Sequence, residues 1–174
     1  PTPSSAIGVV ADHGEGLGAH GETQHGHLLY QETMRVPMVL VGPGVEPGVS
    51  ESPVSTRRIF HTLLDWAGRG GDGSLRRERQ EVVLGEAMKP FLSYGWQPQV
   101  MAVAGRQKAI LAGRIEAYNL AADPREEKDL GSGTSLPSPM RQALEEYPVP
   151  SVEGAPTAHT LSEEARRRCA DEMQ

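Results

Sequence analysis

Two short apolar runs limit the fold of this chain more than any other feature. Residues 6–11 read AIGVVA and stop at Asp12, and residues 36–41 read VPMVLV and stop at Gly42. Continuous apolar runs of this length are typical of strands that are buried on both faces, as in parallel sheets. Residues 28–35, LLYQETMR, indicate a short helix between the runs. Residues 6–41 therefore predict a strand, a loop, a helix and a second strand in this order, with the two strands parallel.

A longer helix is predicted after the second run. Ser55 can cap a helix over residues 56–68, TRRIFHTLLDWAG. The apolar side chains of this segment recur at helical spacing and make one stripe, formed by Phe60, Leu63, Leu64 and Ala67. His61 lies beside the stripe, where we expect a packing or surface role.

The second half of the chain predicts a small antiparallel sheet and a tail. Four strand-like runs between residues 81 and 120 (EVVLG, VMAVAG, KAILAG and RIEAYNL) are separated by glycine turns, and AGRQKA and AGRIEA read as hairpins. Residues 121–130 predict an Asp-Pro turn and a short helix. Residues 131–160 are rich in Gly, Ser and Pro, so we expect them to lie extended, before a final helix over 161–173.

Composition excludes some classes of function. The formal net charge is −6, which argues against a nucleic-acid surface because such surfaces need clustered Lys and Arg. No run of eighteen apolar residues is present, so we expect no membrane span in this segment. The single cysteine, Cys169, allows no internal disulfide. The chain opens at Pro1 and enters a strand-like run almost at once, so we expect its start to be a cut.

Four of the six histidines lie within residues 13–27, directly after the first run. Asp12 offers oxygen ligands and His13 a nitrogen ligand at a strand end, where open α/β sheets bind ligands. Gly14 allows the bend that both side chains need in order to reach one ion. Taken alone, Asp-His-Gly also fits a turn with an Asx-type hydrogen bond. The order and spacing of the residues that follow Gly14 decide between a metal site and a simple turn.

The order and spacing of these residues resemble a motif of a known family. Residues 9–45, VVADHGEGLGAHGETQHGHLLYQETMRVPMVLVGPGV, look like the metal-binding motif in the carboxyl-terminal half of the sulfatase family, in the alkaline-phosphatase superfamily. VSTRRIFHTLLDWAG is similar to the helix that follows this motif, GRIEAYNLAADPREEKDLG to a signature near the end of the catalytic region, and LSEEARRR to the terminal helix.

The resemblance implies an α/β fold, part of an alkaline-phosphatase-like sheet sandwich of parallel strands and helices, followed by a small antiparallel subdomain. It divides the chain into residues 1–70, the α/β core with half of a metal site, residues 71–130, the antiparallel subdomain, and residues 131–174, a tail with a terminal helix.

The resemblance also implies roles for three residues. Asp12 and His13 would be ligands of a divalent metal, which is usually calcium, with manganese or zinc as alternatives. His25 would contact the sulfate or phosphate oxygens and help the leaving group, since imidazole can donate a hydrogen bond and transfer a proton. His20 and His27 are expected at the surface, and Glu15 either orients a ligand or is a capping or solvated residue.

The implied site is incomplete in this chain. Sulfatases attack with a formylglycine made from Cys or Ser in a Cys/Ser-x-Pro-x-Arg motif, which we expect only in a preceding amino-terminal part. Cys169 does not fit that motif, and SLPSP, residues 135–139, has Pro139 where Arg is required. With no nucleophile there is no covalent step, so we predict no sulfatase turnover by this chain alone.

Three readings remain open at this point. The first is a metal-dependent hydrolase of small-molecule or glycan sulfate esters. The second is a phosphoryl relative, a phosphonate monoester hydrolase or phosphoethanolamine transferase, acting on a phosphate ester. The third is a non-catalytic binding module derived from a sulfatase half. The oligomeric state is open in all three.

Overall fold

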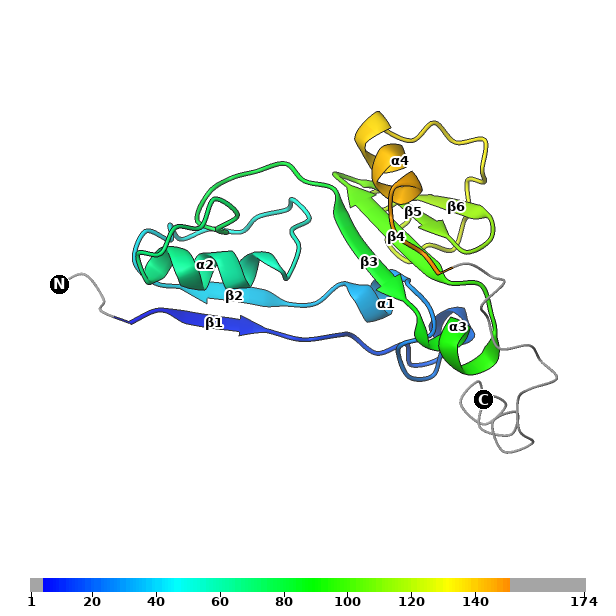
Figure 1. Cartoon of the computed structure of the whole chain (residues 1–174), viewed down its shortest axis with the longest axis horizontal. Coiled ribbons are helices and arrows are strands. Elements are labelled where there is room, and N and C mark those ends of the chain that lie inside the picture. Colours follow the sequence, from blue (N-terminus) through cyan, green and yellow to red (C-terminus); the bar gives the residue numbers. More distant parts are fainter. Residues whose placement is uncertain (1–4, 151–174) are drawn as a thin grey trace.

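The computed structural model describes residues 5–150 (Figure 1). The predicted terminal helix over 161–173, with Cys169, lies outside the described residues. Along the chain the elements are β1 (Ile7–Val10), a 3₁₀ turn (Ala19–Gly21), α1 (Gln31–Met34), β2 (Met38–Val41), α2 (Arg58–Trp66), β3 (Val83–Ala87), α3 (Lys89–Tyr94), β4 (Gln99–Ala104), β5 (Gln107–Leu111), β6 (Ile115–Asn119) and α4 (Ser138–Glu145).

A four-stranded antiparallel sheet, in the order β3-β4-β5-β6, forms the larger part of the fold. The β4–β5 and β5–β6 hairpins turn at Gly105 and Gly113, which both have positive φ, a conformation that favours glycine. The predicted strands, the two hairpins and the mixed α/β class are therefore confirmed. Residues 121–130 contain turns rather than the predicted helix, because the Asp123 carboxylate accepts the backbone N–H groups of Glu127 and Lys128 and holds a loop.

Each face of this sheet has its own apolar cluster. Alternation along β4 sends Met101 and Val103 to one face, against Leu29 just before α1, while Val100 and Ala102 face the opposite side. Tyr30 and Met34 are partly buried and pack against the edge of the first cluster. The four-stranded sheet is thus covered on both sides.

Helix α4 covers the second face and corrects the prediction that residues 131–160 lie extended. Met140 and Leu144, one helical turn apart, are buried against Val100 and Ala102. Pro139 lies in the first turn of the helix, where proline is tolerated because its missing N–H would have no intrahelical partner. The Gly, Ser and Pro content of this segment therefore concealed a short amphipathic helix.

Strands β1 and β2 pair antiparallel, with Ile7 opposite Val41 and Val9 opposite Val39, so the prediction of parallel strands here was wrong. A parallel pair needs a crossover connection, usually a helix that spans the sheet. Helix α1 has only four residues, and the chain instead runs out through a long loop and returns beside β1 (Figure 1).

The paired strands and α2 carry exposed apolar side chains. Ile7, Val9, Val39 and Val41 share one face and are 57%, 61%, 56% and 54% exposed. The strands predicted to be buried on both faces are therefore exposed in this chain. The predicted stripe of α2 is also open to solvent at Phe60 and Leu63, and the buried positions of α2 are Arg58 and Thr62. His61 is exposed, in line with the surface role expected for it.

Within residues 5–150 no helix is long and apolar enough to cross a membrane.

Candidate active site

Asp12 and His13 follow β1 directly, at the point where the chain leaves the two-stranded sheet. The His13 backbone N–H donates to Asp12 Oδ1 at 3.0 Å, and Asp12 Oδ2 lies 3.8 Å from His13 Nε2. The pKa of the Asp12 carboxyl is lowered because the backbone N–H groups of Asp12 and His13 hydrogen-bond its charged form. Asp12 therefore presents an ionised, solvent-facing carboxylate beside an imidazole.

The contacts of His13 indicate which ring nitrogen is available. His13 Nδ1 lies 2.9 Å from the Gly14 carbonyl oxygen, to which a protonated Nδ1 donates. In that tautomer Nε2 keeps its lone pair and faces Asp12. A backbone carbonyl that fixes the imidazole tautomer in this way is the usual support of a metal-binding histidine.

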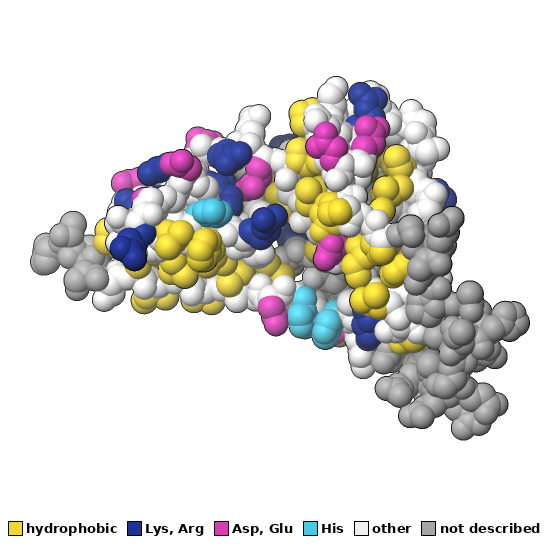
Figure 2. Space-filling model, in the orientation of Figure 1, with side chains coloured by type: hydrophobic (Ala, Val, Ile, Leu, Met, Phe, Trp, Pro, Cys, Tyr) yellow, Lys and Arg dark blue, Asp and Glu magenta, His cyan; other side chains and the backbone are white. Residues whose placement is uncertain are grey.

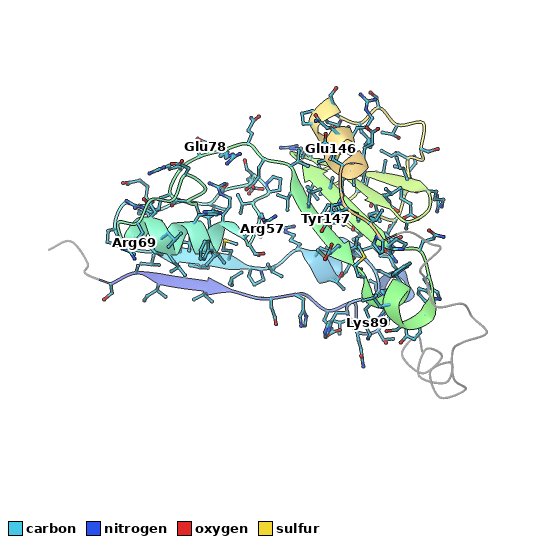
Figure 3. The ribbon with its side chains drawn as sticks, viewed as in Figure 1. Arg57, Arg69, Glu78, Lys89, Glu146 and Tyr147 are labelled. Carbon is cyan, nitrogen blue, oxygen red and sulfur yellow. The ribbon has the colours of Figure 1, made fainter. Side chains whose placement is uncertain are left out.

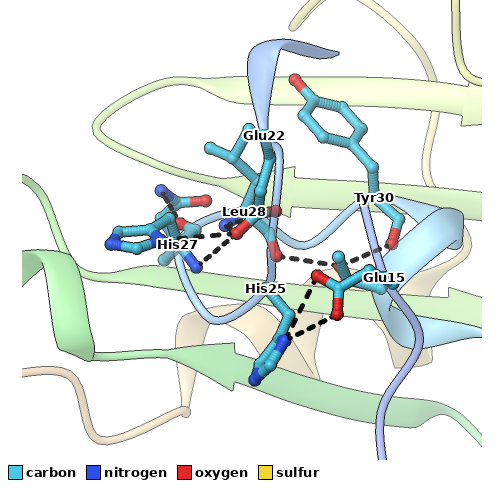
Figure 4. A network of polar contacts seen from close by, with 8 residues as sticks. Glu15, Glu22, His25, His27, Leu28 and Tyr30 are labelled. Carbon is cyan, nitrogen blue, oxygen red and sulfur yellow. Dashed lines mark hydrogen bonds and ion pairs between the residues drawn. The ribbon is translucent and has the colours of Figure 1, made fainter. Parts of the chain in front are cut away.

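His25 lies against His13, although twelve residues separate them in sequence. The two rings stack with centroids 3.7 Å apart and planes inclined by 21°. Nδ1 of His25 is 3.3 Å from both carboxylate oxygens of Glu15, which holds the ring from the far side (Figure 4). Of the two roles left open for Glu15 in the sequence, the orienting contact is the one seen. The structure thus brings Asp12, His13 and His25 to one place.

Two glycines allow this loop to fold so tightly. Gly14 donates its N–H to the Thr33 carbonyl oxygen at 2.8 Å, and a Cβ on Gly14 would lie 1.9 Å from the Glu32 carbonyl oxygen. Gly16 donates to the Gln24 carbonyl oxygen at 2.7 Å, and a Cβ on Gly16 would lie 2.2 Å from the Glu22 carbonyl oxygen. Any side chain at either position would push the loop away from its neighbours.

Glu22 supports the loop from inside and was missed in the sequence. Its buried carboxylate accepts the backbone N–H groups of His27 and Leu28 and contacts His27 Nδ1 at 3.5 Å (Figure 4). His27, expected at the surface, is instead 8% exposed, and its carbonyl oxygen accepts from Gln99 Nε2 of β4. A glutamate three residues before His25 carries no sequence signal that distinguishes it from a solvated one.

A pocket of about 790 Å³ adjoins this cluster, and Glu15 lines it. Its walls join the loop to β6 and to the turn that follows, and include His20, Tyr30, Arg114 and Glu116. His20 is exposed, as expected, and it stacks on Tyr30 at the pocket with ring centroids 3.6 Å apart. The Tyr30 hydroxyl donates to Glu116, and burial raises the pKa of Tyr30 to about 12, so the hydroxyl stays protonated as a donor.

The donor set fits part of a metal site and not a whole one. A separation of 3.8 Å between Asp12 Oδ2 and His13 Nε2 lets one ion lie about 2.0–2.5 Å from both atoms. However, in the described part of the chain no group of three or more His, Cys, Asp or Glu side chains could hold a metal ion. Calcium takes six to eight oxygen ligands, so further ligands would have to come from outside these residues.

Comparisons with known proteins show what this chain is similar to. A family model described as Sulfatase matches residues 3–69. The 2-O GAG sulfatase BT1596 superposes with a TM-score of 0.58 and 24% identity, over 74% of this chain and 32% of its own. A sulfatase-like protein of Bacteroides thetaiotaomicron gives a TM-score of 0.60 and 24% identity, over 81% of this chain and 34% of its own. No match was found among curated proteins.

A third structure, BT4656 in complex with D-glucosamine-2-N,6-O-disulfate, has a TM-score of 0.54 and 22% identity, over 72% of this chain and 29% of its own. The chain thus spans about a third of the length of the solved structures that it matches. The family match covers the β1 loop with Asp12, His13 and His25, and the likeness in fold extends over most of the chain. Residues 3–69 therefore resemble the sulfatase family in sequence, and most of the chain resembles sulfatases in fold.

Proposed function

We propose that this chain supplies one half of a metal-dependent site that hydrolyses sulfuric esters. The observation that carries the proposal is the convergence of Asp12, His13 and His25, with the two imidazole rings 3.7 Å apart inside the sequence matched by the sulfatase model. An anionic ester needs such a site, because the formal charge of −6 on the chain repels it elsewhere.

Asp12 and His13 would hold the divalent metal, calcium first and manganese or zinc as alternatives. When bound, the metal supplies Lewis acidity and a fixed point for the sulfate oxygens. Asp12 offers an ionised carboxylate, and His13 offers Nε2 with its ring held by the Gly14 carbonyl oxygen.

His25 would act on the ester itself. Glu15 accepts from Nδ1 of His25 and thereby fixes the ring, which leaves Nε2 as the atom that faces away from Glu15. When both ring nitrogens carry a proton, His25 can also donate from Nε2, as a hydrogen bond to a sulfate oxygen or as a proton to the leaving oxygen. Stacking on His13 keeps this atom close to the metal ligands.

The pocket shared by Glu15, Tyr30 and Arg114 would hold the organic part of the ester. A sugar suits its lining, since carboxylates and a guanidinium bind hydroxyl groups and an aromatic ring packs on a sugar face. The fold likeness to BT4656, whose structure contains a disulfated glucosamine, supports a sulfated sugar as the substrate class.

The nucleophile, a formylglycine, would come from an amino-terminal part with a Cys/Ser-x-Pro-x-Arg motif. The test is to read the coding frame upstream of Pro1 and to assay the extended polypeptide on aryl and sugar sulfates, with Asp12→Ala and His25→Ala as variants. We expect hydrolysis by the extended polypeptide, a loss of at least about 100-fold in each variant and no turnover by the 174-residue chain. Turnover by the short chain, or an extended polypeptide that hydrolyses only phosphate esters, contradicts the proposal.

A further inference from the structure

A second pocket, remote from the histidine cluster in the sequence, lies between α2 and the four-stranded sheet. Its volume is about 950 Å³, within the range of small-molecule sites. Residues 52–61 and 79–84 form two of its walls, and the β4–β5 turn with the start of α4 closes it. Figure 2 shows Lys and Arg side chains around the hollow between α2 and the sheet.

The charges that line this pocket are unequal. Three arginines, Arg57, Arg58 and Arg79, face a single lining carboxylate, Glu81. Their formal sum of +2 contrasts with the net charge of −6 on the whole chain. A pocket of this sign in an acidic protein attracts anions and repels the cations that the rest of the surface favours.

Arg58 and Glu81 form an ion pair, so the positive charges of Arg57 and Arg79 remain available to a ligand. Arg58 is buried and donates to Glu81 Oε1 at 3.2 Å and to the carbonyl oxygens of Gly73, Ser74 and Arg77. Glu81 Oε1 also accepts the Ser55 backbone N–H. Arg57 and Arg79 are exposed, and neither forms an ion pair with any residue of the described part of the chain.

The amino terminus of α2 opens onto the same pocket. Ser55, Arg57 and Arg58 belong both to this terminus and to the pocket lining, and the first turn of α2 contains no acidic residue. The partial positive charge at a helix amino terminus favours negative charge nearby, and the Glu81 carboxylate already accepts the Ser55 N–H there. The hydroxyl of Ser52, the amide of Gln80 and the ring of His61 add hydrogen-bonding groups around the pocket.

From the pocket, its excess of arginines and the two arginines without an ion-pair partner among the described residues, we propose that a tetrahedral oxyanion binds here. The anion would be a sulfate or phosphate group held between Arg57 and Arg79. Arg57 approaches from the start of α2 and Arg79 from the segment before β3, so the anion bridges the α2 unit and the four-stranded sheet. The group can arrive as a free ion or as a substituent on a larger molecule. This binding does not depend on the metal-dependent site at Asp12.

The test is a chemical-shift titration of the isotope-labelled 174-residue chain with sodium sulfate, at constant ionic strength kept with sodium chloride. We expect saturable shifts at the side-chain N–H groups of Arg57 and Arg79. Arg57→Gln and Arg79→Gln should each weaken binding by about 5- to 10-fold, because each removes one charge-assisted hydrogen bond at an exposed site.

Arg69→Gln is the matched control. Arg69 is exposed like Arg57 but lies beyond the opposite end of α2, away from the pocket (Figure 3). Both R57Q and R79Q remove only exposed side chains, and circular dichroism checks that each variant keeps its fold. Asp12→Ala should leave the sulfate titration unchanged, which separates this proposal from the proposed function.

Two further titrations identify the source of the anion. If a sulfated disaccharide binds through the same residues more tightly than inorganic sulfate, the group arrives on a sugar. If inorganic sulfate or phosphate binds as well as the sugar, the site takes the free ion. Either result supports the proposal. Shifts that do not saturate, or that R69Q weakens as much as R57Q does, overturn it.

Discussion

Single residues of the loop between β1 and α1 decide whether the candidate site can form. Asp12 and His13 are adjacent, so their contact could be predicted from the sequence. His25 was assigned only by resemblance, and its stacking on His13 needs the reversal of the chain at Gly14 and Gly16. No periodicity reports that reversal, because it depends on backbone contacts between residues far apart in the sequence. The role of Glu15 was left open for the same reason.

A methyl group at Gly14 should damage both the loop and its chemistry. The Cβ of Gly14→Ala would lie 1.9 Å from the Glu32 carbonyl oxygen, so the backbone must move. We expect the free energy of unfolding to fall by about 2–3 kcal/mol, as in other overpacked sites, and the His13–His25 contact to be lost. Gly48→Ala is the control, since a Cβ there meets nothing within 4 Å. Chemical denaturation and histidine ring resonances measure both effects, and equal stability of the two variants would contradict this expectation.

At the scale of the elements, buried polar pairs connect the site loop to the four-stranded sheet. Lys108 of β5 and Glu126 are both fully buried, with Nζ and Oε1 2.6 Å apart, and Glu126 Oε2 accepts the backbone N–H of Gln31 at the start of α1. Burial lowers the pKa of Lys108, while the Glu126 carboxylate opposes that shift. The sequence predicted the strand that carries Lys108 but not its burial, because lysine in a strand ordinarily faces water.

Replacing only one member of the Lys108–Glu126 pair should destabilise the fold more than replacing both. Lys108→Met leaves the Glu126 charge buried without its partner, and we expect it to lower the free energy of unfolding by about 3–5 kcal/mol. The double variant Lys108→Met, Glu126→Gln removes both charges and should recover at least half of that loss. Urea denaturation of the three proteins provides the comparison. A double variant as unstable as the single one would show that charge burial is not the cause.

The acid stability of β6 should depend on Asp129. Its carboxylate accepts the backbone N–H groups of Ala117 and Gly131 and pairs with Arg114, and these contacts lower its pKa below the ordinary value of 3.8. Because the pKa of Asp129 is lower in the folded state, its ionised carboxylate stabilises the fold at a pH above its unfolded-state pKa. This stabilisation is lost as the pH falls through the folded-state pKa.

Asp129→Asn should therefore be less stable than the wild type at about pH 6, by about 1 kcal/mol, and the difference should shrink towards about pH 3. Thermal unfolding across this range follows it. Parallel stability curves for the two proteins would exclude Asp129 as the source of the acid dependence.

The elements themselves were predictable to different degrees. The β4–β5–β6 hairpins followed from glycine turns between apolar runs, because turn chemistry is local. The direction of β1 against β2 was not predictable, since an apolar run does not report its partner. Helix α4 was concealed by the Gly, Ser and Pro residues around it, although Met140 and Leu144 have helical spacing.

At the scale of the whole molecule, this chain has one covered sheet and one open one. The four-stranded sheet is packed on both faces, whereas the β1–β2 pair exposes four aliphatic side chains on one face. Figure 2 shows hydrophobic side chains along this part of the surface. Two-stranded sheets with apolar faces are rarely stable uncovered. The chain spans about a third of the length of its structural neighbours.

The exposed face should make the 174-residue chain self-associate at micromolar concentration. Val9 and Val39 are opposite each other at its centre and are both more than half exposed. We expect V9K and V39K to reduce the association, because a charge on an apolar sheet face prevents stacking of copies. Size-exclusion chromatography with light scattering measures the mass. A wild-type chain that stays monomeric over the whole concentration range would contradict this account.

Asp12 and His13 should bind one divalent ion, with His25 beside it. The most direct measurement is a titration of the isotope-labelled chain with Mn²⁺, a paramagnetic probe, while the histidine ring resonances are followed. We predict selective broadening of His13 and His25, reversal by excess Ca²⁺, and loss of the effect in Asp12→Ala. Uniform broadening of all histidines, or broadening of His13 and His25 that persists in Asp12→Ala, would contradict the claim.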